Sequence, residues 1–271
     1  ISTIGWDLLQ RNAREEVLYN ARLLIDSASA VRKYTLDRIY PLLLTQAKYE
    51  FRPEMVSAFS AIEVLKILRN AEPEYRQFLY REPALNPTNP ADRAVEWEAD
   101  LINQFRGGTL QAPAAGERDT PGGRMLYVAK PLKATAGCLF CHDTPDKAPP
   151  TMVALYGPNN GFGWKLDEIV AAQIVQVPLA VAQARAEHTF RVFMALTGGV
   201  FVVVAVVLNL VLWRVFVRPV TRMAALADRV SLGETDAPEF SVKSRDEIGT
   251  LAASLTRMRV SLAQAFKMLE G

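Results

Sequence analysis

The chain contains only two cysteines and two histidines, and three of these four residues fall in one short segment, at Cys138, Cys141 and His142. The spacing is C-x-x-C-H, the attachment signature of a c-type haem. In that chemistry each thiol forms a thioether to one vinyl group, and the histidine becomes the proximal ligand of the iron. The segment therefore predicts one covalently bound haem c on Cys138 and Cys141, with His142 as its iron ligand.

Two other interpretations of the segment are weaker. A disulfide between Cys138 and Cys141 would resemble a redox motif, but no thioredoxin-like βαβ pattern surrounds it, and so short a loop gains little from a cross-link. Zinc prefers four ligands, commonly cysteine and histidine. The only other histidine, His188, stands at the edge of a long apolar segment, so zinc is a poor fit.

The sixth position of the iron is open to several interpretations. The methionines that precede the apolar segment are Met55, Met125 and Met152. A methionine ligand would raise the haem potential, and Met55 or Met125 is the candidate distal ligand. Methionine is more often a core residue, so an open or weakly held site is the alternative.

The apolar segment runs from Val192 to Trp213, 22 residues without a charge. At about 1.5 Å per residue it is long enough to cross a hydrocarbon core of about 30 Å. It predicts one transmembrane helix over residues 189–214.

The charges that flank this helix predict its orientation. Positive residues favour the cytoplasmic side. Upstream, Arg185 and Arg191 are accompanied by Glu187, whereas four arginines follow the helix, at Arg214, Arg218, Arg222 and Arg229. We therefore expect a protein of the bacterial inner membrane with residues 1–188 in the periplasm, where free thiols do not normally persist, and the C-terminal part in the cytoplasm.

The N-terminal region reads as one long helix over residues 6–40, ended or kinked by Pro41. The sequence starts without methionine, as expected after removal of a signal peptide or of an earlier membrane helix. Apolar residues recur at 4-3-4-3 spacing, at Val17, Ala21, Leu24, Ala28 and Val31. Such a narrow seam suits either a dimer partner or a groove on its own domain. Residues 1–40 are therefore predicted to form a separate membrane-proximal helix.

Residues 41–188 are expected to form a small α+β domain. Helices are predicted over residues 52–75 and 84–105, with Asn89 capping the second at Pro90. Glycine- and proline-rich turns follow at 107–123. Strands are predicted at 125–132 and 173–179.

Three blocks of this region together resemble the single-haem, PAS-like periplasmic sensor domains of bacteria, namely "LNPTNPADRAVEWE", "CLFCHDTPDKAP" and "YGPNNGFGWKLDEIVAAQIVQVP". The resemblance covers roughly residues 10–185. It implies a PAS-like antiparallel sheet behind a long N-terminal helix, and a covalent haem on the two cysteines with His142 as axial ligand. Some members supply a cysteine from the N-terminal helix as second axial ligand, but this chain has no third cysteine.

Residues 215–268 resemble a HAMP domain. Pro219 opens a first helix, Gly233 ends it, and the segment from Asp246 to Gly249 begins a second. Each helix carries an apolar seam of the coiled-coil type. The seam of the first helix consists of Val220, Met223, Ala227 and Val230, and that of the second consists of Ile248, Leu251, Leu255, Met258 and Leu262. The resemblance implies a parallel four-helix bundle in a homodimer, joined through HAMP and the N-terminal helix.

The leading hypothesis is a membrane-bound c-type haem sensor that detects redox state or a small gas and relays it through the membrane helix to HAMP. The alternative is a membrane-anchored monohaem cytochrome that transfers electrons to a respiratory or photosynthetic complex. A separate cytoplasmic output protein or redox partner is expected. The net charge of +2 gives no sign of a nucleic-acid partner. No enzymatic activity is predicted, because no second histidine is placed for acid–base work at the haem.

Overall fold

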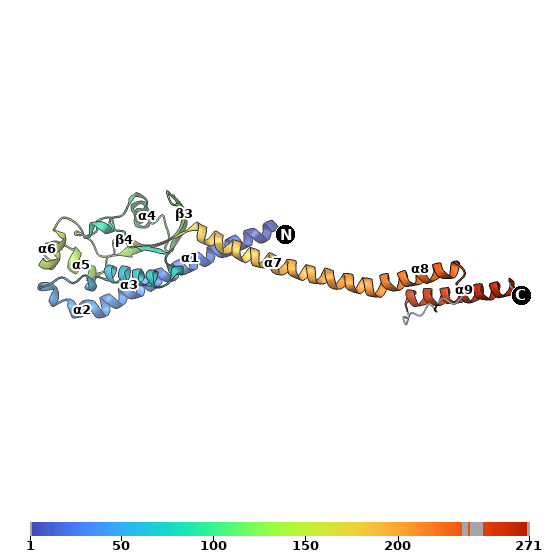
Figure 1. Cartoon of the computed structure of the whole chain (residues 1–271). Coiled ribbons are helices and arrows are strands. Elements are labelled where there is room, and N and C mark those ends of the chain that lie inside the picture. The colour runs from blue at the N-terminus through green and yellow to red at the C-terminus, as the bar shows by residue number, and fades with distance from the viewer. Residues whose placement is uncertain (1, 235–237, 239–245, 270–271) are drawn as a thin grey trace. The chain divides into compact units, whose positions relative to one another are not determined.

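The structure is a computed structural model that describes residues 2–234, 238 and 246–269. The chain divides into two compact units, Ile1–Phe190 and Arg191–Gly271. The helices of the first unit are α1 (Ser2–Tyr34), α2 (Tyr40–Leu43), α3 (Ser57–Ala71), α4 (Glu96–Arg106), α5 (Ala136–His142) and α6 (Pro150–Tyr156), with a π-helical turn η1 (Thr35–Ile39) and short 3-10 turns η2 (Gln46–Lys48), η3 (Pro53–Met55), η4 (Pro73–Tyr75) and η5 (Pro90–Asp92) (Figure 1).

The first unit is built around one antiparallel sheet of four strands in the order β1-β4-β3-β2. The strands are β1 (Leu79–Arg81), β2 (Ala114–Thr120), β3 (Gly123–Lys133) and β4 (Ile169–Pro178). Side chains alternate between the two faces along each strand. On β4, Val175 and Val177 pack against α1, whereas Ala172 and Ile174 pack against Ile102 and its neighbours on α4. The sheet is therefore covered on both faces, and the α+β fold class is confirmed.

The apolar seam of the N-terminal helix is used inside its own unit. Val17 and Ala21 are fully buried against β3 and β4, and Ala28 is buried against Ala61 of α3. Of the two interpretations of the seam, the groove on its own domain is the one the structure shows. A different stripe of α1 carries exposed apolar side chains, at Ile4, Leu8, Tyr19, Leu23 and Tyr34.

The predicted helix over residues 6–40 is confirmed, and it extends further at both ends. Pro41 does not stop it, because the preceding turn is π-helical and Pro41 lies in the first turn of α2, where its missing N–H costs little.

Other boundaries differ from the prediction. The helix expected over 84–105 begins only at Glu96; Asn89 instead caps the short turn η5, accepting a hydrogen bond from the amide of Ala91 at 3.2 Å. The region 107–123 is predicted as turns, but it contains the whole of β2, which pairs along its length with β3. The predicted strands are confirmed as parts of β3 and β4.

A long helix, α7 (Leu179–Leu212), follows β4 without an intervening residue and continues through the π-turn η6 (Trp213–Val217) into α8 (Arg218–Ser231). Within the first unit its beginning packs on α1, where Ala182 and Ala186 are buried and Arg185 pairs with Glu16 at 2.7 Å. Among the described residues, one stretch is long and apolar enough to cross a membrane, Leu179–Ser231, with a mean hydropathy of 2.7 over its most apolar part.

The second unit contains the pair α8 and α9 (Glu247–Leu269). Gly233, with φ of +93°, follows the end of α8, a conformation that favours glycine. Asp246 caps α9, accepting the amide protons of Ile248 and Gly249 at 3.1 Å each. Met223 and Val230 of α8 pack with Ala252 of α9. Part of both seams remains exposed, at Val220, Leu251, Met258 and Leu262.

Candidate functional site

The helix α5 places the three residues of the C-x-x-C-H segment on one side. Residues three and four apart on a helix are neighbours on its surface, so Cys138, Cys141 and His142 share a face. The helix is held at both ends. The amide of Ala134, just before it, donates to the carbonyl of Glu168 at 2.8 Å, and the amide of Trp164 donates to the carbonyl of His142 at 3.1 Å.

The imidazole of His142 is fixed by two contacts. Its Nδ1 lies 2.6 Å from the carbonyl oxygen of Gly161, and the ring of Trp164 stacks on it at 4.0 Å with an interplanar angle of 10°. A carbonyl only accepts hydrogen bonds, so Nδ1 carries the proton in this contact and the lone pair of Nε2 remains available for a metal. Burial lowers the pKa of His142 and thereby favours the neutral ring, while the hydrogen bond to Gly161 acts in the opposite direction.

Gly161 permits this arrangement. Its φ of +83° is one that other residues rarely adopt, and a Cβ there would lie 2.8 Å from the backbone nitrogen of Thr88. The Thr88 hydroxyl is itself 3.4 Å from Nδ1 of His142. The glycine-rich loop after α6 can therefore lie against Thr88, with the carbonyl of Gly161 on His142, because residue 161 lacks a side chain.

Cys138, Cys141 and His142 all line one cavity of about 340 Å³. Ligand pockets in proteins commonly have volumes of about 300–1,000 Å³. Its other walls come from α1, η1, α2, η3, α3, η5, β3, α6 and β4 and from the segment that joins β1 to η5. Both thiols are free. Burial, with a smaller contribution from Cys138, raises the pKa of Cys141 to about 11, so this thiol is protonated at neutral pH.

Of the three methionines considered as distal ligands, two line the cavity and one does not. Met55 in η3 and Met152 in α6 are both buried and line the cavity with His142. Met125 lies on β3 opposite Pro178 and does not line the cavity. The cavity also includes Tyr40, which the sequence did not single out; burial, followed by the nearby cysteines, raises its pKa to about 12.

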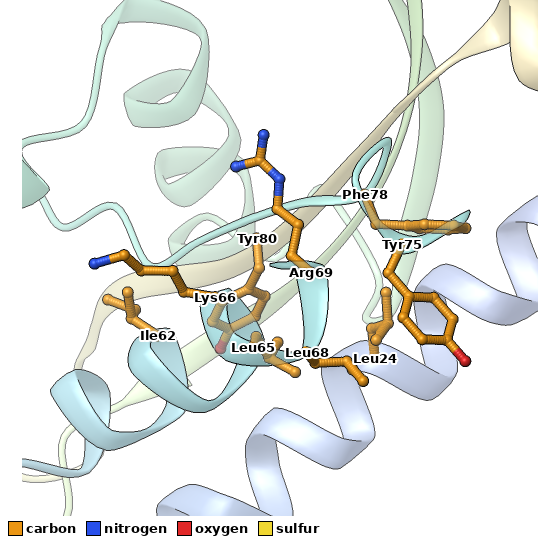
Figure 2. A pocket seen from close by; sticks show the side chains of 9 residues that line it. All are labelled: Leu24, Ile62, Leu65, Lys66, Leu68, Arg69, Tyr75, Phe78 and Tyr80. Carbon is orange, nitrogen blue, oxygen red and sulfur yellow. The ribbon is translucent and has the colours of Figure 1, made fainter. Parts of the chain in front are cut away.

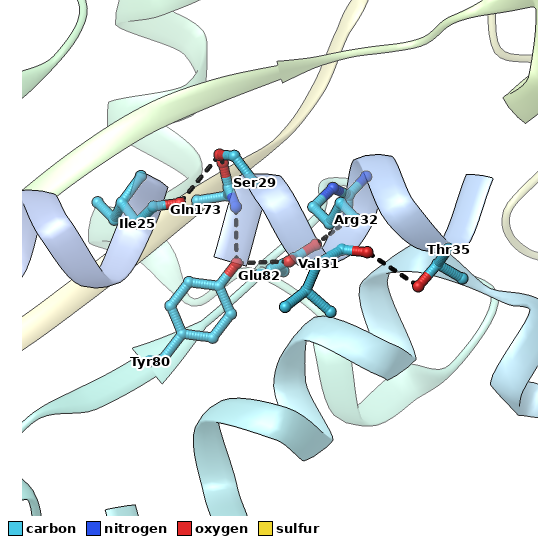
Figure 3. A network of polar contacts seen from close by, with 8 residues as sticks. All are labelled: Ile25, Ser29, Val31, Arg32, Thr35, Tyr80, Glu82 and Gln173. Carbon is cyan, nitrogen blue, oxygen red and sulfur yellow. Dashed lines mark hydrogen bonds and ion pairs between the residues drawn. The ribbon is translucent and has the colours of Figure 1, made fainter. Parts of the chain in front are cut away.

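A buried polar network forms another part of the cavity wall (Figure 3). Arg32 of α1 forms an ion pair with Glu82, and both residues line the cavity. The Tyr80 hydroxyl donates to Glu82 at 2.5 Å and accepts a hydrogen bond from the amide of Gln173 at 2.8 Å. The amide oxygen of Gln173 accepts from Ser29 at 2.9 Å. Sequence reasoning missed this network, because its members lie far apart in the chain; the only local signal is the Y-x-E spacing of Tyr80 and Glu82.

A second, smaller cavity of about 160 Å³ lies between α1, α3 and the segment that leads into β1 (Figure 2). Most of its lining side chains are apolar or aromatic, and Tyr80 is among them. Tyr80 therefore contacts both regions, with its ring at the small cavity and its hydroxyl on Glu82.

A HAMP domain model matches residues 211–264, which confirms the predicted HAMP domain. An α+β unit, one candidate span and a HAMP domain together define a membrane-bound sensor or signal transducer. The Tll0287-like family model matches residues 10–178, and the chain belongs to this family.

One solved structure matches part of this chain. The crystal structure of the cyanobacterial haem protein Tll0287 matches with 17% sequence identity and a TM-score of 0.44, over 60% of this chain and 95% of that one. No curated protein matches the chain.

Proposed function

We propose that the protein is a membrane-bound sensor that carries one haem c, attached through Cys138 and Cys141 and ligated by His142. The observation that supports this most directly is the arrangement of these three residues on one face of α5, lining one cavity. A haem c would need both thiols and the histidine close to one another, and a single helix turn supplies that.

The surroundings of His142 fit the role of an iron ligand. Metal-bound histidines almost always donate their other N–H to a carbonyl or carboxylate, which fixes the tautomer. Gly161 supplies that acceptor here, at 2.6 Å. When bound, the haem would supply an iron centre that changes oxidation state and can take up small ligands. The protein's part is to orient the histidine, bury the centre and exclude water.

For the distal side we propose Met55. It is the one of the two predicted candidates that lines the cavity; Met125 does not. Met152 also reaches the cavity wall and is the competing thioether. The sequence contains no third cysteine that could serve as a distal ligand.

For signal output we propose a path through β4 and α7. β4 forms part of the cavity wall through Val170 and Ala171, and it ends at Pro178, where α7 begins at Leu179. The same chain then enters the HAMP helices. We further propose that the first unit lies in the periplasm and HAMP in the cytoplasm, because arginines predominate after the span.

A second copy of the chain is the expected partner. The seam residues of α8 and α9 that stay exposed in the described part of the chain suit a four-helix bundle with a second copy. The exposed stripe of α1 between Ile4 and Tyr34 would extend the contact.

The first test is the absorption spectrum of the purified full chain in detergent, oxidised and reduced, with a pyridine haemochrome. A c-type haemochrome supports the proposal, and a b-type or absent spectrum contradicts it. Titration with CO and NO then separates the stimuli: ready binding favours gas sensing, and an inert low-spin iron favours redox sensing. Fast electron exchange with a quinol or cytochrome pool, without a change in dimer packing, would instead indicate an electron carrier.

A further inference from the structure

Glu82 is a buried carboxyl in the wall of the cavity that holds His142. Its side chain is 3% exposed, and it follows β1 at the point where the chain turns toward η5. Carboxyl groups are rarely buried so deeply unless they are paired. Because Glu82 lines the cavity, its charge acts directly on whatever the cavity contains.

The groups that act on Glu82 come from each element around it. Arg32 of α1 pairs with it, the Tyr80 hydroxyl of β1 donates to it, and Asp92 of η5 adds a like charge. Lys133 and Glu63 line the same cavity. Burial raises the pKa of Glu82, while Arg32 and Tyr80 lower it. These opposing influences leave the carboxyl responsive to one further unit of charge in its cavity.

We propose that Glu82 is a proton-binding site coupled to the oxidation state of the haem. This inference rests on the proposed function. A one-electron donor outside the chain is oxidised, ferric haem is reduced to ferrous, and the carboxylate of Glu82 binds one proton from solvent. Oxidation reverses each change. Proton uptake accompanies reduction because the iron site becomes more negative by one charge, and a like charge disfavours the carboxylate form.

The same proton changes the network of Figure 3. The carboxylate of Glu82 accepts the hydrogen bond of Tyr80, whose hydroxyl is in turn bonded to Gln173. A protonated carboxyl carries its own donor and is a weaker acceptor. Gln173 belongs to β4 and is bonded to Ser29 of α1. The proton site is therefore linked through Tyr80 to the strand that leads into α7, and it pairs directly with Arg32 of α1.

The test is the midpoint potential of the full-length haem-loaded chain as a function of pH, for wild type, Glu82→Gln and Glu98→Gln. Glu98 is the matched control, because it is also buried and paired with an arginine, Arg81 at 3.1 Å, but does not line the cavity. In wild type and in Glu98→Gln, the potential should fall with rising pH with a slope that approaches one proton per electron. In Glu82→Gln this slope should be lost. The potential of Glu82→Gln should then match wild type at acidic pH and exceed it at alkaline pH.

A wild-type slope in Glu82→Gln would show that the proton binds elsewhere, for example on a propionate or Asp92, and would overturn the inference. A pH-independent potential in wild type would overturn it as well. Absence of a haemochrome in wild type would contradict both the proposed function and the inference. The two outcomes above would contradict the inference alone, so the two failures are distinguishable.

A second measurement locates the proton without relying on the potential. The reduced-minus-oxidised infrared difference spectrum of wild type should contain the C=O stretching band of a protonated carboxyl, shifted in D₂O. The band should persist in Glu98→Gln and be missing from Glu82→Gln. A band unchanged in Glu82→Gln overturns the assignment.

Discussion

Nδ1 of His142 lies 2.6 Å from the carbonyl oxygen of Gly161, 19 residues further along the chain. This contact ties α5 to the glycine-rich loop and determines which ring nitrogen of His142 can face the cavity. A histidine that rotates freely would present either nitrogen, whereas this one presents Nε2.

Gly161→Ala should damage the site more than Gly163→Ala. Both glycines have φ near +82°, so both variants incur a backbone cost of about 1–2 kcal/mol. Only at residue 161 does the added Cβ also meet Thr88, because nothing lies within 4 Å at residue 163. Thermal unfolding and haem content should both fall further in Gly161→Ala. Equal losses in the two variants would mean that the contact with Thr88 is unimportant.

Cys138→Ser and Cys141→Ser should each retain haem through a single thioether, and the double variant should lose covalent attachment. The expected readout is a shift of the pyridine haemochrome band in each single variant and haem that is extracted by acidified solvent from the double variant. Met125→Leu is the control, since Met125 lies outside the cavity. Covalent haem in the double variant would refute attachment at these cysteines.

Met55→Leu should change the distal side of the haem, whereas Met125→Leu should not. A swap of methionine for leucine in a core usually costs under about 1.5 kcal/mol, so folding is preserved. Loss of the thioether should lower the midpoint potential and open the iron to CO. Met152→Leu is measured in parallel. If Met152→Leu alone gives these changes, Met152 rather than Met55 is the distal ligand.

Leu262→Glu should weaken the dimer, because Leu262 belongs to the exposed part of the HAMP seam. A charge buried between helices without a partner is strongly destabilising. Gln264→Glu places the same charge on the opposite face of α9 and should leave the dimer unchanged. Sedimentation or cross-linking of the full chain in detergent gives the oligomeric state. Dimers of equal strength in both variants would exclude this seam as the interface.

Glu82→Gln should alter how the stability of the chain depends on pH. Burial raises the folded-state pKa of Glu82 above its ordinary value of 4.5. At pH values between 4.5 and the folded-state pKa, the unfolded chain binds fewer protons than the folded chain. The contribution of Glu82 to the free energy of unfolding therefore falls as pH rises, by at most about 1.4 kcal/mol per pH unit. Relative to wild type, the variant should therefore gain stability with rising pH and then level off. Thermal unfolding over the range checks this, and a constant difference would contradict it.

The sequence predicted the parts of the fold that have strong local signals. The uncharged segment before Trp213, the seams around Met223 and Ile248, and the long N-terminal helix all appear in the structure, because helical periodicity and charge are read within one element. The short strands β1 and β2 were missed. β2 follows a proline and contains glycine and charged residues, and it is held by pairing with β3 rather than by its own propensity.

In the candidate site, too, only the residues with a local sequence signal were predicted. Cys138, Cys141 and His142 were found by spacing, since they share one helix turn. That Tyr40, Glu82 and Met55 line the cavity, and Met125 does not, depends on which distant elements meet, and local spacing in the sequence does not reveal this. Val17 and Ala28 are an example. Their spacing was compatible with a dimer partner or with a groove on the same domain, and in the structure they pack against the sheet and α3.

The position of both cysteines on α5 has a practical consequence. The chain has two thiols in all, and the proposed attachment uses both. A mature chain would therefore take up no maleimide after unfolding, and an immature chain would take up two. Mass spectrometry of labelled protein would then count the fraction of chains that completed maturation, independently of any optical property of the cofactor.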